Sequence, residues 1–222
     1  MARYTRQAVL HTGSMRLVQN AAERRTAVLP KKEEKMRSYQ ITEYCHRFVK
    51  EYIAEGDCCV DATAGNGGDT EFLCRCVGRT GKVYAFDIQK TAIEHTRMRL
   101  KEAGYIERAV LFQAGHEQMA SYVEEEVSAV LFNFGYLPGG DHQIATRAKT
   151  SVEGVKQGMK LLKKGGIMSL CIYSGRDTGY EEKEALLDFL KRLDSKKWLV
   201  ILNCYYNREN NPPLPVFVIR LK

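Results

Sequence analysis

The chain has little of what marks a membrane protein or a repeat protein. No apolar run among its 222 residues approaches the roughly 18 residues of a membrane span, and the N-terminus lacks the apolar segment of a secretory signal. There is no internal repeat and no low-complexity tract, and the chain contains only one Trp and five Pro. We therefore expect a globular domain with a full core and no membrane partner, which the 44% hydrophobic and 27% charged content supports.

Metal-binding and nucleophile signatures are also missing. The seven cysteines form no C-x-x-C pair, and most lie in apolar runs, as reduced core cysteines do. Cys74 and Cys76 fall within a helical pattern, where we expect no metal role. No cluster of His, Cys and Asp has metal-ligand spacing, and no G-x-S-x-G appears. These features predict no metal cofactor and a reducing, cytoplasmic location.

Positive charge is concentrated at the N-terminus. The net charge is +7, and residues 1–37 carry nine Lys and Arg against three Glu, a balance of +6. We predict that residues 1–37 are a basic, mobile extension and that residues 38–222 form the catalytic domain. Two interpretations of the extension stay open. It aids RNA binding through phosphate contacts, or it lies upstream of a domain that begins at Met36.

A glycine-rich segment, residues 59–70, is the most informative part of the chain. A short apolar run ends in Asp61, a turn follows, and a helical pattern then begins. A second apolar run ends in Asp87, where an acid can accept hydrogen bonds from ribose hydroxyls. Glycines and a helix N-terminus together can cradle a nucleotide-like ligand. The predicted cofactor-binding residues here are Asp61, Thr63, Gly65, Asn66, Gly67, Asp69, Thr70, Asp87 and Gln89.

Dinucleotides and S-adenosylmethionine are the two ligand classes that use such a segment. The dinucleotide fingerprint G-x-G-x-x-G fits Gly65 and Gly67 but has Thr70 at its third position. The charge of Asp61 would repel a pyrophosphate, whereas it suits the amino group of S-adenosylmethionine. The pattern favours a methyltransferase over an NAD-dependent oxidoreductase. A glycine turn in another α/β protein stays as an alternative.

The hydrophobic pattern predicts an α/β fold. Helices are expected at 39–54, 68–77, 90–103, 116–124, 143–163 and 180–193, and strands at 57–62, 82–87, 109–113, 128–133, 167–173, 198–204 and 214–221. Gly165 and Gly166 are expected to stop the fifth of these helices. Alternating elements imply a parallel sheet, and the last two strands, with no helix between them, should form a hairpin. This predicts the Rossmann-like methyltransferase fold, a seven-stranded, mostly parallel sheet with one antiparallel strand and helices on both faces.

The loop after the fourth strand should carry the chemistry, because ligands of such sheets bind beyond the carboxyl ends of the strands. Asn133 and Tyr136 have the N-x-x-Y spacing of amino-group methyltransferases, in which an amide oxygen orients the nitrogen and a ring stacks the base. Asp141 can hold or remove an amine proton. A plain connecting loop, with Asp141 as a helix cap, is the alternative. The predicted catalytic residues are Asn133, Tyr136 and Asp141, with substrate contacts from Gly139, Gly140 and His142.

Two further segments are candidates for ligand contacts. Gly115 and His116 follow the third strand, where they are expected beside the adenine. The connection at 203–213 combines aromatic, amide and Arg side chains that can bind unpaired bases, and its predicted substrate-binding residues are Tyr206, Arg208 and Asn211. His46 and His95 show no partner pattern and are interpreted as incidental.

These motifs together resemble the MnmM family, also called YtqB. The resemblance runs from about Met36 to Lys222 and rests on five segments in one order: Asp61-Ala62-Thr63-x-Gly65-Asn66-Gly67, Phe86-Asp87-Ile88-Gln89, His116-Glu117, Phe132-Asn133-x-Gly135-Tyr136-Leu137-Pro138-Gly139-Gly140-Asp141 and Asn210-Asn211-Pro212-Pro213. The chain departs from the family at Gly68, where His is usual, and at Gly115, where Ser is usual.

The resemblance implies an activity. Members of this family use S-adenosylmethionine to methylate the aminomethyl group of 5-aminomethyl-2-thiouridine at the wobble position of tRNA, so the implied partner is a tRNA anticodon stem-loop. Alternatives are an rRNA base methyltransferase with the same cofactor and a non-catalytic RNA-binding protein. The intact Asp61, Gly65, Gly67 and Asp87 argue against the latter. A homodimer stays possible, because the sequence does not determine the oligomeric state.

Overall fold

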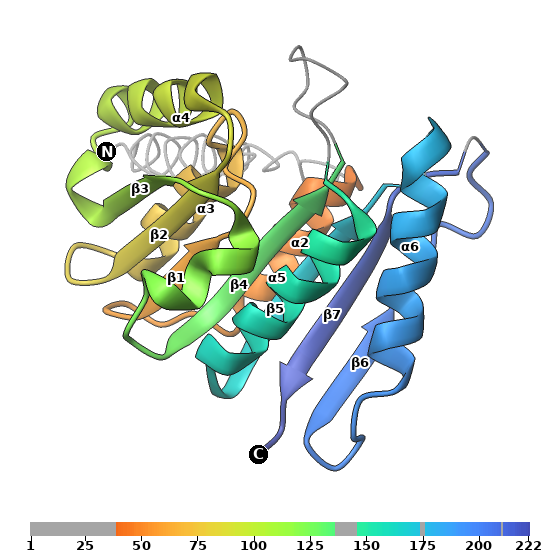
Figure 1. Cartoon of the computed structure of the whole chain (residues 1–222). Helices are drawn as coiled ribbons and strands as arrows, with labels where there is room; N and C mark the ends of the chain where they lie inside the picture. Colours follow the sequence, from red (N-terminus) through yellow and green to blue (C-terminus); the bar gives the residue numbers. More distant parts are fainter. Residues whose placement is uncertain (1–38, 136–145, 174–175, 210) are drawn as a thin grey trace, which may run out of the picture. The chain divides into compact units, whose positions relative to one another are not determined.

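The computed structural model describes residues 39–135, 146–173, 176–209 and 211–222 (Figure 1). Predictions for residues 1–38, the basic extension among them, lie outside the described residues. Within the described ranges, no helix is long and apolar enough to cross a membrane. The fold below belongs to the unit Ser38–Lys222.

Seven strands form one sheet in the order β3-β2-β1-β4-β5-β7-β6 (Figure 1). β7 runs antiparallel to both of its neighbours, and all other neighbouring pairs are parallel. The strands are β1 (Cys58–Asp61), β2 (Lys82–Asp87), β3 (Ala109–Gln113), β4 (Val127–Phe134), β5 (Leu162–Ile172), β6 (Trp198–Leu202) and β7 (Leu214–Arg220). The predicted fold class is confirmed, including the hairpin of the last two strands.

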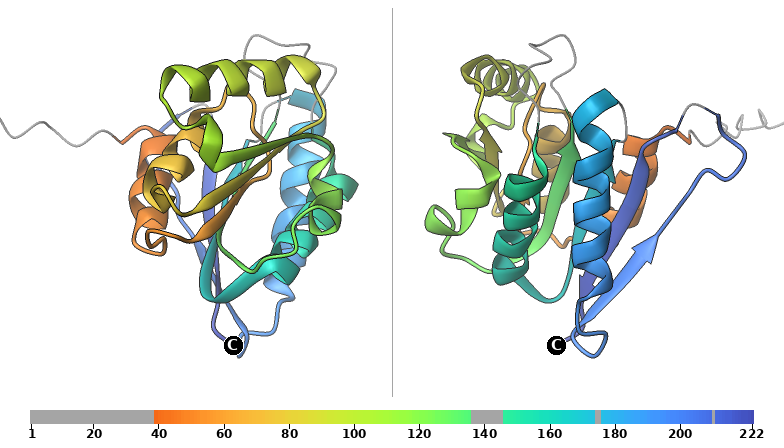
Figure 2. Two further views of the ribbon diagram at one scale, coloured as in Figure 1. Left: turned by 90° about the vertical axis from the view of Figure 1, so that its left-hand side faces the viewer. Right: turned by 45° about the vertical axis from the view of Figure 1, so that its right-hand side comes forward.

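Helices cover both faces of this sheet, which makes a three-layer sandwich (Figure 2). One face packs against α2 (Ile41–Lys50), α3 (Gly68–Val77) and α4 (Lys90–Glu102). The other packs against the 3-10 helix η2 (His116–Ser121), α5 (Ala148–Leu161) and α6 (Arg176–Lys191). A short 3-10 helix, η1 (Ile106–Arg108), precedes β3. The predicted helix at 116–124 is thus a shorter 3-10 element.

The central strand β4 shows how the sequence assigns side chains to the two faces. Leu131 packs in the cluster with α2 and α3, whereas Val130 and Phe132 pack in the cluster with α5. Strand side chains alternate between faces, and a strand covered on both faces is apolar throughout. Burial of each such Leu or Phe side chain stabilises the fold by about 1.5–3 kcal/mol. The same alternation directs Asn133 to the face that carries α2 and α3.

The segment between α5 and β5 differs from the prediction. The helix expected at 143–163 ends two residues earlier, and β5 begins at once and runs through Gly165 and Gly166. The prediction that these glycines stop the helix was therefore wrong. Gly165 has φ +77°, and a Cβ on Gly166 would lie 2.9 Å from the backbone oxygens of Lys163 and Ser128. Gly165 permits the positive φ and Gly166 permits the close backbone approach, where the β4–β5 register is irregular.

Candidate active site

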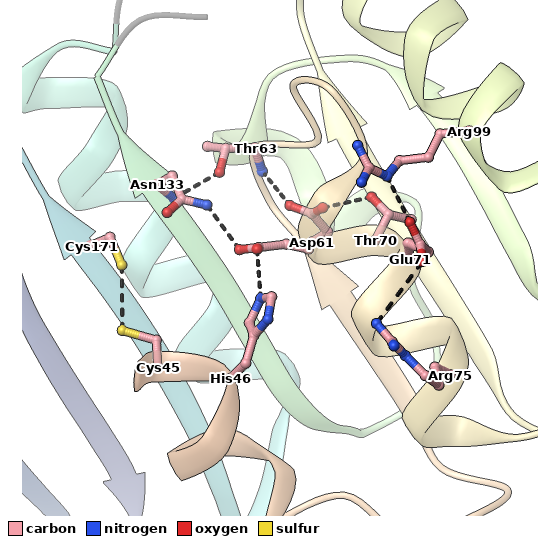
Figure 3. Close-up of polar contacts among 11 residues, drawn as sticks. Cys45, His46, Asp61, Thr63, Thr70, Glu71, Arg75, Arg99, Asn133 and Cys171 are labelled. Carbon is pink, nitrogen blue, oxygen red and sulfur yellow. Dashed lines mark hydrogen bonds and ion pairs between the residues drawn. The ribbon is translucent and has the colours of Figure 1, made fainter. Parts of the chain in front are cut away.

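The switch point of the sheet lies between β1 and β4, because the strand order reverses there. In an open α/β sheet, ligands bind at this point, beyond the carboxyl ends of the strands. Asp61 is the last residue of β1, and Asn133 is the penultimate residue of β4. The backbone N–H of Asn133 donates to Thr63 Oγ1 at 2.7 Å, which ties the two strand ends together (Figure 3). The fold therefore brings to one place residues predicted to bind the methyl donor and a residue predicted to orient the methyl acceptor.

Asp61 lies beneath the glycine loop and has no exposed surface. One carboxylate oxygen accepts from the Thr63 backbone N–H at 3.1 Å, and the other accepts from Thr70 Oγ1 at 2.6 Å. These bonds join the end of β1 to the first turn of α3. Burial, together with the negative charge of Asp69, raises the pKa of Asp61 to about 7. Asp61 thus shapes the loop from within, and its interaction with a cationic ligand stays a prediction.

Asp87 anchors the same loop from β2. Its Oδ2 accepts from the Gly65 backbone N–H at 3.0 Å, and its Oδ1 accepts from the Gln89 backbone N–H at 2.9 Å. Asp87 and Gln89 are partly exposed, so the carboxylate keeps lone pairs available for a ligand hydroxyl. Ile88, between them, has a side chain that is 55% exposed. An apolar surface beside an acceptor suits a ribose that carries a flat base.

Gly67 is required by its contact with a neighbouring helix. Its φ is +79°, and a Cβ there would lie 2.9 Å from the Thr96 backbone on α4. Its approach to a ligand stays a prediction. Gly68 is exposed, and a Cβ there would meet nothing within 4 Å. His95, interpreted as incidental, places Nδ1 3.1 Å from Asn66 Oδ1, and so belongs to the surroundings of this loop.

Asn133, Asp69 and His46 form a hydrogen-bonded chain at the switch point. Asn133 Nδ2 donates to Asp69 Oδ2 at 2.8 Å, and Asp69 Oδ1 lies 2.7 Å from His46 Nε2. Figure 3 shows the His46 ring directed from α2 toward this network. The interpretation of His46 as incidental was wrong, since it contacts a predicted cofactor-binding residue. No local motif pointed to it, because α2 meets α3 and β4 only in the fold.

His116 lies inside the core, with 8% of its surface exposed. Its ring stands edge-on to Phe132 and Phe134, and a Cβ on Gly154 of α5 would lie 2.4 Å from it. Burial lowers the pKa of His116, so the ring is neutral. Stacking on an adenine needs an exposed ring face, which His116 does not present here. Gly115 before it is buried as well.

The connection between β6 and β7 lies at the same edge of the sheet, because Leu214 pairs with Ile172 at the carboxyl end of β5. Tyr205 is held against the start of α2, and its hydroxyl donates to the Tyr39 carbonyl at 2.9 Å. Tyr206 is 97% exposed. Tyr206, one of the predicted substrate residues of this connection, is therefore at the surface.

The other two predicted residues of this connection are also at the surface. Arg208 is exposed, and its guanidinium lies 5.4 Å from the centre of the Tyr205 ring. Asn211 has φ +47° and donates from Nδ2 to the Tyr180 hydroxyl at 3.1 Å. These contacts hold the connection between α2 and α6.

Five predicted residues of the β4 loop lie outside the described residues: Tyr136, Gly139, Gly140, Asp141 and His142. The base of that loop is described. The Thr146 N–H donates to the Gly135 carbonyl at 3.0 Å, and the Gly135 N–H donates to Thr146 Oγ1 at 2.9 Å. Thr146 Oγ1 also donates to the buried carboxyl of Glu182 on α6 at 2.9 Å. Sequence reasoning missed Glu182, which no motif distinguishes from the other acids of α6.

Within the described ranges, no group of three or more His, Cys, Asp or Glu could hold a metal ion. The switch point brings together a glycine loop, the partly exposed carboxylate of Asp87 and the Asn133 amide. Together with the antiparallel β7, these features place the chain in the class of S-adenosylmethionine-dependent methyltransferases with a Rossmann-like fold.

Comparisons with known proteins narrow the class to a family. The family described as "Putative rRNA methylase" matches residues 83–219. The tRNA (mnm(5)s(2)U34)-methyltransferase, chloroplastic, of Arabidopsis thaliana is 39% identical over 191 residues, which are 82% of this chain and 69% of that protein. The chain belongs to this family, which is the MnmM family that its motifs resemble.

Solved structures agree with this assignment. A crystal structure of a putative rRNA methylase from Clostridium thermocellum is 43% identical with a TM-score of 0.81, over 83% of this chain and 100% of that one. A putative methyltransferase from Streptococcus mutans, in complex with SAH, is 34% identical with a TM-score of 0.76, over 83% of this chain and 100% of that one.

Proposed function

We propose that the protein transfers a methyl group from S-adenosylmethionine to the aminomethyl nitrogen of 5-aminomethyl-2-thiouridine at the wobble position of tRNA, giving 5-methylaminomethyl-2-thiouridine. The observation that carries the proposal is the oriented amide of Asn133 at the switch point, 2.8 Å from Asp69. The name of the Arabidopsis relative, at 39% identity, supports the nucleoside.

The residues around the glycine loop fit the cofactor. Asp87 is the proposed acceptor for the ribose hydroxyls, and the exposed Ile88 is the proposed platform for the adenine. The exposed backbone at Asn66 and Gly68 opens the start of α3, whose N-terminus favours negative charge such as a carboxylate. The buried charge of Asp61, when ionised, favours the cationic methionine end.

The acceptor side would orient the amine. S-adenosylmethionine supplies an electrophilic methyl group on a sulfonium. Asn133 Oδ1 accepts one amine hydrogen and so directs the nitrogen lone pair toward that methyl. The alkylamine arrives largely protonated at neutral pH, and Asp141 is the proposed group that takes the proton. Tyr136 is the proposed stacking partner of the base.

The proposed RNA contact is the surface formed by the 203–211 connection and the start of α2. Tyr206 offers an exposed ring, and Arg208 offers a cation over the neighbouring Tyr205 ring. Stacking and cationic contacts of this kind bind unpaired bases, as in an anticodon loop. We further propose that the basic segment 1–37 adds phosphate contacts.

The proposal is tested by incubation of the protein with S-adenosylmethionine and tRNA that carries 5-aminomethyl-2-thiouridine, followed by mass spectrometry of the nucleosides. A gain of one methyl on that nucleoside is the expected result. rRNA from cells that lack the gene is the parallel substrate, because the family description names rRNA. Methylation of rRNA alone would replace the proposal with an rRNA base methyltransferase.

A cytoplasmic location is part of the same proposal. All seven cysteines are free thiols in the structure, and four of them are buried. Free thiols fit a reducing compartment. Fractionation of cells that express the chain, with detection of the protein by antibody, would test the location.

A further inference from the structure

Helix α2 reaches the switch point through His46, a residue that neither the family motifs nor the proposed chemistry includes. Its Nε2 lies 2.7 Å from Asp69 Oδ1, and its ring stacks on Phe72 of α3 with 3.8 Å between ring centres and 3° between planes. The side chains of His46 and Asp69 are 20% and 10% exposed. The contact is therefore specific in geometry and shielded from water.

The contact matters because of what Asp69 does to Asn133. An ionised carboxylate only accepts hydrogen bonds, so the amide must present its Nδ2 hydrogens to Asp69. Because the nitrogen of the planar amide bonds Asp69, the Asn133 oxygen lies on the other side of the amide from that bond. An amide turned the other way would offer N–H groups to an incoming amine and could not accept from it. Asp69 thus decides which atom of Asn133 meets the substrate.

Asp69 itself needs a donor on its other side. Asp61 is a second carboxyl close enough for the negative charge of Asp69 to affect it, and like charges at short distance repel. The His46 nitrogen holds Asp69 Oδ1 from the side of α2, which leaves Oδ2 for Asn133. Without that donor, the carboxylate is free to rotate away from Asn133.

We propose that His46 is a positioning residue for methyl transfer, which acts through Asp69 to hold the Asn133 amide with its oxygen toward the acceptor amine. The inference rests on the proposed function, because it takes an amine as the acceptor. The His46 side chain touches neither substrate nor cofactor in this role. Its loss should therefore change the rate of transfer and leave cofactor affinity unchanged.

Two substitutions separate hydrogen bonding from packing. His46→Phe keeps a ring to stack on Phe72 and removes the donor, and it should lower the single-turnover rate by about 10- to 100-fold, as small misplacements of positioned groups do. His46→Gln restores an N–H donor and should recover most of that rate. Cys45→Ala, at the preceding position of α2, is the control for packing. Cys45 is buried and contacts Cys171, and it makes no hydrogen bond to Asp69 or Asn133.

A double-mutant cycle provides the readout that a merely structural role would not produce. If His46 acts through Asn133, then His46→Phe should have no further effect on the rate in an Asn133→Ala background. Losses that multiply in full would show that the two residues act independently, and would overturn the positioning role. Thermal unfolding of each variant shows whether the rate was measured on folded protein.

The orientation of the amide can also be followed without turnover. In ¹⁵N-labelled protein, the Asn133 side-chain signals are identified by their loss in Asn133→Ala, and they should shift in His46→Phe and return in His46→Gln. If the parent protein does not methylate 5-aminomethyl-2-thiouridine, the proposed function fails and these signals still report on His46. If the parent protein methylates this nucleoside, and His46→Phe changes neither the single-turnover rate nor the Asn133 side-chain signals, the positioning role alone is overturned.

Discussion

The two sides of the switch point are built differently. On the β1 side, Asp61 and Asp87 bond the glycine loop from within residues 61–89, and Asp61 has no exposed surface. On the β4 side, contacts join segments far apart in the chain: Asn133 of β4 and His46 of α2 meet at Asp69. Tyr205 likewise reaches Tyr39, and Tyr206 is 97% exposed. We therefore expect a prebuilt cofactor side and an acceptor side that leaves surface for a large partner.

The largest expected effect belongs to the acceptor side. Asn133→Ala should reduce the single-turnover rate by about 100-fold or more, because a hydrogen bond that orients the amine acts chiefly in the transition state. Affinity for S-adenosylmethionine should stay within about twofold, since the β1 side is unchanged. Single-turnover kinetics at saturating cofactor and RNA give the rate, and calorimetry gives the affinity. A rate equal to that of the parent would remove the amine-orienting mechanism.

The converse substitution is Asp87→Ala on the cofactor side. It removes the proposed ribose acceptor and the anchor of Gly65, and a hydrogen bond to a charged group contributes about 1.5–3 kcal/mol. S-adenosylmethionine affinity should fall about 10- to 150-fold, with a smaller change in the rate at saturating cofactor. Calorimetry measures the affinity, and Asp188→Ala, at an exposed position of α6, is the control. Unchanged affinity would place Asp87 outside the site.

The buried Asp61 should make cofactor binding dependent on pH. Its raised pKa of about 7 means that the carboxyl is protonated in the ligand-free protein at lower pH, so the binding of a cation should release a proton. Between about pH 5.5 and 7, affinity should rise by up to about tenfold per pH unit. Over the same range, the contribution of Asp61 to the free energy of unfolding of the ligand-free protein should fall as pH rises, because Asp61 holds its proton in the folded state and has lost it in the unfolded state.

Calorimetry in two buffers of different ionisation enthalpy would measure that proton release. Asp61→Asn, which keeps the shape and lacks the titration, should flatten the dependence of affinity on pH. A parent protein whose affinity does not change from pH 5.5 to 7 would show that Asp61 does not ionise on binding.

Tyr206→Ala tests the exposed surface of the acceptor side, and we expect a smaller effect from it than from Asn133→Ala. Stacking of one base contributes about 1–3 kcal/mol, so the Michaelis constant for tRNA should rise about 5- to 100-fold, with little change in cofactor affinity. Leu199→Ala, which removes an exposed apolar side chain near the other end of β6, is the control. Equal Michaelis constants for the two variants would exclude Tyr206 from the RNA surface.

The smallest effect is expected from removal of the basic segment. A chain that begins at Met36 should bind RNA more weakly at low salt and show a shallower salt dependence, because phosphate contacts release counterions. Turnover at saturating RNA should match that of the full chain. Filter binding across a salt series measures the affinity. Loss of turnover at saturating RNA would mean that the segment belongs to the active site.

The same contrast explains what could be read from the sequence. The bounds of α3 and β2 matched the prediction at both ends, because glycine signals and apolar runs are local. His46 could not be found in this way. Its helix shows which residues are buried, such as Cys45 and Val49, but no local pattern states that α2 packs beside the end of β4. Gly165 and Gly166 misled for a related reason, since glycines that serve a positive φ and a close backbone approach within a strand look the same in the sequence as a helix stop.

The paired contacts of Gly135 and Thr146 have a consequence for engineering. Gly135 and Thr146, the described residues on either side of 136–145, are joined by two hydrogen bonds, and Thr146 also bonds Glu182. This pair of residues provides a fixed attachment point at which the segment between them can be exchanged. Doubling the length of a flexible loop costs only about 0.6 kcal/mol. Segments of other lengths could therefore be grafted between Gly135 and Thr146 to change the accepted nucleoside while the sheet keeps its register.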